Sequence, residues 1–387
     1  MLHVKRITAA VTSHGLAAVL AVLMLTGTAA TAGAASLNDQ AGSASDNAVT
    51  CRTGINVRVA MAPGQPAAST ISGELCSTLA ERRNGAAVQL LIPGATYTHD
   101  YWDFGVVDGA SYSYAREVAA EGIATFAIDP LGTGASSRPA STTITAQADT
   151  FVTHQLVQGL RHGKVSGTRY GQVITVGHSL NSLIAWDEAI AYHDVDGVIV
   201  TGAAHSLAAA FGQAFGTDLH PAGDDPKFAG SGLDDGYLTT VPGVRGTLFY
   251  NKRDADPAVI AADEARKDVV SGTELNTALP VVTSTATQAI NVPVLDILGS
   301  NDFTTCGLNA QGHSFDCATG AAVAAQEAPF YSAQAHIHAC VIPGSGHDIS
   351  LALNNGLQAT DAIAWTDALV THRAAGHFGA GLAWNCG

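Results

Sequence analysis

The chain has 387 residues, of which 47% are hydrophobic and 13% charged, so it is long enough to bury a large core. Its formal net charge is −15. Because an acidic surface repels nucleic acid and anionic lipid, we expect neither as a partner.

Residues 1–34 have the pattern of a secretory signal peptide. Two basic residues precede an apolar run over 16–25, and the small residues 32–34 fit an A-x-A cleavage site. The run is too short to span a bilayer, so we expect cleavage and no stable membrane anchor. The pattern predicts a secreted, extracellular protein in which residues 35–50 form a flexible lead-in.

Six cysteines follow the predicted signal peptide, and an even number in an exported chain predicts disulfides. Alternating strands over 55–61 and 70–75, joined by a turn, predict a hairpin centred between residues 63 and 64. Such a hairpin places two of the cysteines opposite each other, and two others can close a short loop. The predicted pairs are Cys51–Cys76, Cys306–Cys317 and, by elimination, Cys340–Cys386. Metal binding is the alternative, but the chain has no C-x-x-C pair, so we expect no metal.

Beyond the hairpin, apolar strands alternate with helical stretches. Strands are predicted over 87–92, 123–128, 173–176, 195–202, 292–299 and 338–343, and helices over 110–120, 148–160, 180–189 and 361–372. This alternation predicts a mostly parallel sheet wound on both faces, with ligands binding at the carboxyl edge.

The alternation is interrupted over 204–290, which is too long for a loop and contains a helical pattern from 257 to 267. We interpret this stretch as a lid inserted over the carboxyl edge; ordinary surface helices are the alternative. The core is then divided into a first part, 51–203, and a second part, 291–387.

The strand at 173–176 runs into Gly177-His178-Ser179-Leu180-Asn181 and then into a helix. A serine at such a junction lies on a tight, strained turn, and the helix directs its free N–H groups at the same point. Ser179 is therefore the candidate nucleophile. The alternative is a chance string in a glycine-rich chain, because Asn181 stands where this pattern usually has glycine.

A serine hydroxyl needs a base to take its proton and an acid to orient that base. His347 follows the last predicted strand, and Asp302 follows the strand before it. His178 lies beside the nucleophile, but its direction suits packing. Asp348 is a weaker rival for the acid.

The order Ser, Asp, His, together with these turns, resembles the α/β-hydrolase family over nearly the whole chain after residue 34. The resemblance implies the α/β-hydrolase fold, with an N-terminal antiparallel hairpin and an inserted lid. It also implies that the backbone N–H groups of Ala95 and Leu180 hold the oxyanion, although Pro93 stands where a histidine is common.

Three side chains after the oxyanion loop are candidates for lining a substrate pocket, with a place in an aromatic core as the alternative; they are Tyr97, His99 and Trp102. The predicted function is hydrolysis of small neutral carboxylic esters, lactones included, through an acyl-enzyme and without a cofactor. Two alternatives stay open. The fold can serve as a non-catalytic binding protein, or the same site can transfer the acyl group to an alcohol or cyclise it.

Overall fold

The computed structural model describes residues 46–374 and Cys386. The predicted signal peptide and most of the predicted lead-in lie outside the described residues. Within the described part, none of the helices has the length and apolar character needed to cross a membrane.

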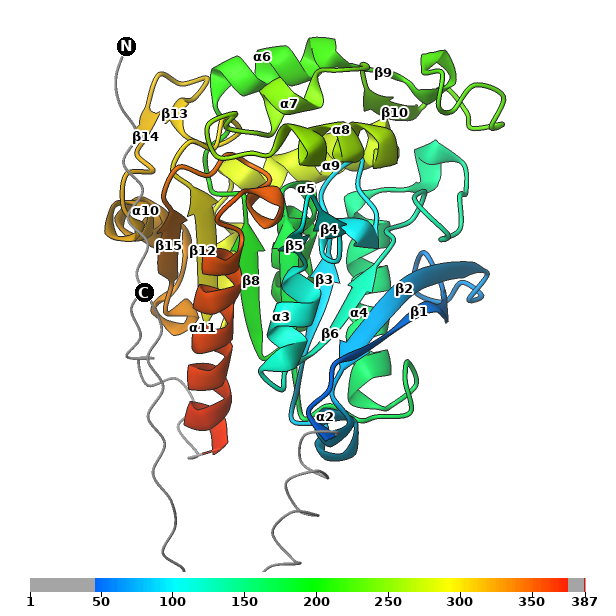
Figure 1. The fold of residues 1–387 in the computed structure, drawn as a ribbon, viewed down its shortest axis with the longest axis vertical. Helices are drawn as coiled ribbons and strands as arrows, with labels where there is room; N and C mark the ends of the chain where they lie inside the picture. The colour runs from blue at the N-terminus through cyan, green and yellow to red at the C-terminus, as the bar shows by residue number, and fades with distance from the viewer. Residues whose placement is uncertain (1–45, 375–385, 387) are drawn as a thin grey trace, which may run out of the picture. The chain divides into compact units, whose positions relative to one another are not determined.

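An eight-stranded sheet forms the centre of the fold, in the order β1-β2-β6-β3-β7-β8-β12-β15 (Figure 1). The strands from β6 to β15 pair in parallel, whereas β1 pairs with β2, and β2 with β6, in antiparallel fashion. The predicted fold class is thereby confirmed. The strands are β1 Thr50–Val59, β2 Ser69–Ser77, β3 Ala87–Ile92, β6 Ala124–Ile128, β7 Gln172–His178, β8 Gly197–Thr201, β12 Val294–Gly299 and β15 His338–Ile342.

Helices cover both faces of this sheet because successive side chains of each strand point to opposite sides. Leu90 of β3 packs in the core cluster of α4 and α5, and its neighbour Leu91 packs in the cluster of α3 and α11. Figure 1 shows α3 and α11 on the near face. The helices are α2 Leu79–Asn84, α3 Tyr114–Ala120, α4 Ala146–Arg161, α5 Leu180–Tyr192, α10 Gly320–Glu327 and α11 Gly356–Ala374.

One predicted helix begins later than expected. Ala110–Tyr112 forms β5, which pairs with β4, Gly105–Val107, and helix α3 begins at Tyr114. The cause is Ser113, whose hydroxyl accepts a hydrogen bond of 3.1 Å from the backbone N–H of Arg116. Such an N-cap fixes a helix start that an apolar pattern alone does not mark.

Several short elements between β8 and β12 gather above the upper end of the sheet in Figure 1. They occupy the stretch interpreted as a lid, and the predicted helix from 257 appears as α8. They are α6 Ala209–Asp218, β9 Leu219–Pro221, β10 Tyr237–Thr240, α7 Arg245–Leu248, α8 Pro257–Arg266, β11 Val270–Ser271 and α9 Gly272–Ala278. After β12, a small hairpin pairs β13, Gly307–Leu308, with β14, Ser314–Phe315.

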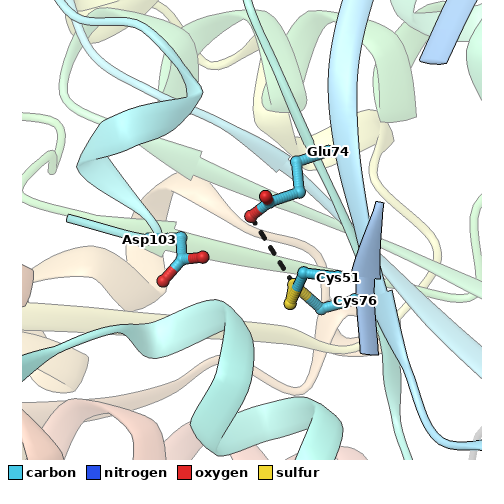
Figure 2. A group of neighbouring side chains, drawn as sticks. All are labelled: Cys51, Glu74, Cys76 and Asp103. Carbon is cyan, nitrogen blue, oxygen red and sulfur yellow. Dashed lines mark hydrogen bonds between the residues drawn. A yellow bond between two sulfur atoms is a disulfide. The ribbon is translucent and has the colours of Figure 1, made fainter. Parts of the chain in front are cut away.

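Three disulfides join the cysteines in the predicted pairs, namely Cys51–Cys76, Cys306–Cys317 and Cys340–Cys386. The first spans β1 and β2, where the two cysteines face each other in the strand register. Figure 2 shows this disulfide beside the carboxyl groups of Glu74 and Asp103. Burial, and then the hydrogen bond and charge of Asp103, raise the pKa of Glu74 to about 7.

Candidate active site

The turn between β7 and α5 holds Ser179 in a strained backbone conformation. Its φ is 53° and its ψ is −122°, a region that residues other than glycine rarely occupy. A Cβ at Gly177 would lie 2.3 Å from the carbonyl oxygen of Asn181 and 2.5 Å from the Cα of Ser182, so only glycine fits there. These constraints give the Gly-x-Ser junction its sharp form and place the serine at the carboxyl end of β7.

Asn181, the departure from the usual glycine, has a partner on the loop after β3. Its side-chain Nδ2 donates a hydrogen bond of 2.6 Å to the carbonyl oxygen of Pro93, and the side chain is only 3% exposed. Pro93 is the other departure from the family pattern. The two unusual residues therefore bond to each other and join the two loops that carry Ala95 and Leu180.

Asp302 and His347 meet at the carboxyl ends of β12 and β15. The Nδ1 atom of His347 lies 3.0 Å from Oδ2 of Asp302, and both side chains are buried. Asp302 also accepts hydrogen bonds of 2.8 Å and 2.7 Å from the backbone N–H and hydroxyl of Thr304. These bonds fix the carboxylate against the imidazole.

The pair shifts the pKa of each partner in the direction that favours charge. Burial alone would raise the pKa of Asp302, but the charge of His347 and the bonds from His347 and Thr304 lower it. Burial alone would lower the pKa of His347, but the charge and hydrogen bond of Asp302 raise it above its usual 6.5. An imidazolium that forms at His347 is therefore stabilised.

Ser179 and His347 line the same cavity of about 450 Å³. Ala95 and Leu180 line it too, and Leu180 is the first residue of α5, so its N–H has no acceptor within the helix. The backbone at Gly202 packs directly against His347, because a Cβ on Gly202 would lie 2.9 Å from the Nδ1 atom of His347. Residues that follow four parallel strands, namely β3, β7, β8 and β15, thus line one cavity.

The rest of the cavity wall is mostly apolar and comes largely from the elements between β8 and β12. Among the described lining residues, none has a formally charged side chain apart from the titratable His347. The apolar residues from these elements are Leu207, Phe211, Phe215, Leu219, Leu238, Phe249, Leu275, Leu279 and Val282. A dry wall of this kind suits an uncharged, apolar group.

The three candidate pocket residues have different places. Tyr97 lines the cavity, and its hydroxyl donates a hydrogen bond to Asp348. Trp102 is fully buried in the core on the near face, and His99 bonds to Asp129 Oδ1 at 2.7 Å; neither lines this cavity. An aromatic-rich loop gives no signal that separates a pocket residue from a core residue.

His178 is buried beneath the site. Its Nδ1 lies 3.0 Å from the hydroxyl of Thr201, and its ring stacks on Tyr101 with the ring centres 4.3 Å apart. Its position agrees with packing. Its Nε2 lies 3.4 Å from Asp348 Oδ1, a second His–Asp contact beside the first that sequence reasoning did not identify.

Three groups of possible metal ligands include residues named from the sequence, and one of them joins Asp361 to the disulfide-bonded Cys340 and Cys386. Cys51 and Cys76 lie with Glu74 and Asp103, but a disulfide takes up both sulfur atoms (Figure 2). His347 groups with His178 and Asp348, yet its Nδ1 is already held by Asp302. The cysteine groups therefore cannot bind a metal without breaking a disulfide.

Comparison with known proteins agrees with this architecture. The model of the alpha/beta hydrolase family matches residues 89–363. A soluble variant of monoglyceride lipase from Saccharomyces cerevisiae is 15% identical, with a TM-score of 0.56 over 81% of this chain and 96% of that one. An esterase from Thermogutta terrifontis is 15% identical, with a TM-score of 0.54 over 82% and 99%. No curated protein matches the sequence. At this identity the solved structures show the fold alone.

Proposed function

The chain belongs to the α/β-hydrolase family, and from that premise we propose that it is a secreted serine hydrolase of neutral carboxylic esters, lactones included. The observation that carries the proposal is the shared cavity. A serine on a strained turn and a histidine bonded to a buried carboxylate line one mostly apolar space. The three disulfides suit an oxidising, extracellular location.

In the proposed reaction, His347 takes the proton of the Ser179 hydroxyl as the oxygen attacks the ester carbonyl. The N–H groups of Ala95 and Leu180 donate to the oxyanion, and Asp302 holds the imidazole in the required tautomer. His347 then returns the proton to the leaving alcohol. His347 next takes a proton from water as the water oxygen attacks the acyl-enzyme, and it returns that proton to the Ser179 oxygen as the carboxylic acid leaves.

The cavity wall supports an apolar acyl group as the part of the substrate that enters. Each buried CH₂ contributes about 0.8 kcal/mol, which is roughly a fourfold change in kcat/KM. We therefore expect kcat/KM for p-nitrophenyl esters to rise about fourfold per methylene until the cavity is filled. An acyl chain that ends in a carboxylate or an ammonium group should be a poor substrate because no described lining residue carries a fixed charge to pair with it.

A phosphonate probe followed by peptide mapping tests the nucleophile. We expect a single adduct on Ser179, lost in a His347→Ala variant, and a fall in kcat of roughly 10⁴- to 10⁶-fold in Ser179→Ala. Ser206→Ala is the matched control, since Ser206 also lines the cavity but lies away from the turn. Absence of an adduct on folded protein would instead favour a binding role. Product analysis with added alcohol separates hydrolysis from acyl transfer.

A further inference from the structure

Three metal-ligating side chains converge away from the catalytic cavity, at the outer layer of α4 and α5. His154 comes from α4, Glu188 from α5, and Asp194 from the turn between α5 and β8. One ligand atom of each lies within 4.8 Å of those of the others. None of these residues lines the cavity described above.

Glu188 is the unusual member of this group. It is fully buried, and neither of its carboxylate oxygens has a hydrogen-bond partner among the described residues. Burial, followed by the neighbouring Asp194 carboxylate, raises the pKa of Glu188 to about 10. A buried carboxylate without a hydrogen-bond partner is costly, and a cation held between Glu188 and its neighbours would remove that cost.

Neighbouring side chains hold the donors in place near the surface. The Nδ1 atom of His154 lies 2.8 Å from Asp194 Oδ2, and its ring stacks on Tyr192 with the ring centres 3.9 Å apart. The side-chain amide of Gln158 donates to the same carboxylate. The side chains of His154 and Asp194 are 24% and 16% exposed, so both residues reach the surface, whereas the Nδ1 atom of His154 is itself buried.

Arg161, a positively charged side chain near this group, already has other partners. The guanidinium of Arg161 donates to the backbone carbonyl of Asp194 at 2.9 Å and pairs with the carboxylate of Asp196. It therefore does not neutralise the Glu188 and Asp194 side chains directly.

We propose that His154, Glu188 and Asp194 bind a divalent transition-metal cation of the Zn²⁺ type. One imidazole nitrogen with two carboxylate oxygens is a donor set for such ions, whereas Ca²⁺ and Mg²⁺ prefer oxygen ligands only. Ligand atoms around a tetrahedral Zn²⁺ lie about 3.4 Å apart at its usual bond lengths. The 2.8 Å contact between His154 and Asp194 must therefore open by about half an ångström.

The ion has a structural consequence. It joins two helices and the turn between α5 and β8, and α5 is the helix that begins directly after Ser179. A cation that binds only the folded chain raises the melting temperature. The proposed site thus braces the helix behind the nucleophile, and it stands whether or not the chain is a hydrolase.

Equilibrium dialysis of the untagged, disulfide-intact protein against Zn²⁺, with metal analysis and thermal unfolding, tests this site. We expect one zinc per chain and a rise in Tm. We also expect Glu188→Gln to lower the affinity at least about a hundredfold, since even the outer partners of metal ligands contribute about 10- to 100-fold. His162→Gln, which changes an exposed histidine on the same part of the chain, is the matched control and should bind as wild type does.

Two results would overturn the proposal. If the wild-type protein binds no zinc, the Glu188–Asp194 pair holds a shared proton instead. If Glu188→Gln keeps one zinc at unchanged affinity, the ion lies elsewhere, for example at His178 and His347. Should Glu188→Gln not fold, His154→Gln provides the same comparison, because its side chain is partly exposed.

Discussion

The bond between Asn181 and Pro93 makes a demanding prediction about the proposed oxyanion site. In Asn181→Ala the carbonyl of Pro93 loses its 2.6 Å donor. A buried acceptor left unpaired costs about 1–3 kcal/mol, so the free energy of unfolding should fall by that amount. The loop that carries Ala95 also loses its tie to the turn that carries Leu180.

The catalytic effect is bounded by the loss of one oxyanion donor, which lowers kcat by about 10²- to 10³-fold. We expect kcat for a short ester to fall by roughly 10- to 10³-fold with KM nearly unchanged. The reason is that the Asn181–Pro93 hydrogen bond positions donors that bind the oxyanion of the transition state, and these donors contribute little to binding of the substrate. The assay is steady-state kinetics on p-nitrophenyl acetate, with urea unfolding of the same samples.

Asn276→Ala serves as the control for this experiment, since Asn276 lines the cavity from α9 and lies far along the chain from the turn. It should leave kcat for the short ester within about twofold of wild type. The reasoning fails if Asn181→Ala loses stability as expected and yet keeps wild-type kcat. Asn181 would then be a packing residue only.

Three further predictions concern the base, the cavity wall and a buried acid. The pKa of His347 is raised and its neutral form is the base, so kcat/KM should rise with pH through an apparent pKa above 6.5; a flat profile from pH 5 to 9 would exclude His347 as the base. Gly216 lines the cavity and a Cβ there would meet no atom within 4 Å, so Gly216→Leu should lower kcat/KM for octanoate esters at least tenfold and leave acetate esters unchanged. Burial raises the pKa of Glu274 from 4.5 to about 8, so the folded state keeps a proton that the unfolded state releases, and stability is lost as pH rises between these values. Glu274→Gln should therefore gain stability over wild type from pH 5 to pH 8, by at most about 5 kcal/mol, in urea unfolding.

The disulfide between Cys51 and Cys76 shows how local patterns predicted the fold. The hairpin was expected to centre between residues 63 and 64, but its inner pairs, such as Val59 with Ser69, are offset by one residue. A bulge between Arg52 and Ile55 removes the offset, so the cysteines face each other as predicted. Alternation and turn residues indicate that two strands pair, whereas a bulge depends on packing that no short stretch encodes.

The sequence predicted those residues of the candidate site that stand directly after a strand. Ser179, Asp302 and His347 each stand just after a predicted strand, and parallel strands bring their carboxyl ends to one edge. The contact between Asn181 and Pro93 joins residues 88 positions apart and has no local signature. The place of Trp102 could not be predicted either, because tertiary packing decides whether an aromatic ring on a loop faces the cavity or the core.

Part of the stretch between β8 and β12, which we interpreted as a lid, is bonded firmly to the core. Arg245 of α7 is buried and pairs with Asp263 of α8 at 2.8 Å, and its guanidinium lies 4.2 Å from the ring centre of Tyr97 in the core. The Nη1 atom of Arg245 donates a hydrogen bond of 2.7 Å to the hydroxyl of Thr96. Removing one partner of a buried ion pair costs about 3–5 kcal/mol, so α7 and α8 are held in place.

The segment that follows α7 also contacts the loop that carries His347, the proposed base. The carbonyl of Phe249 accepts a hydrogen bond of 3.0 Å from the backbone N–H of Asp348, the residue after His347. Tyr97, under Arg245, donates to the carboxylate of the same Asp348. Because these contacts share the segment that positions His347, a change at Arg245 should disturb the base as well as the covering elements. Helix α6, by contrast, contributes Phe211 and Phe215 to the cavity wall and has no part in this ion pair, so the two parts of the cover are tied to the core differently.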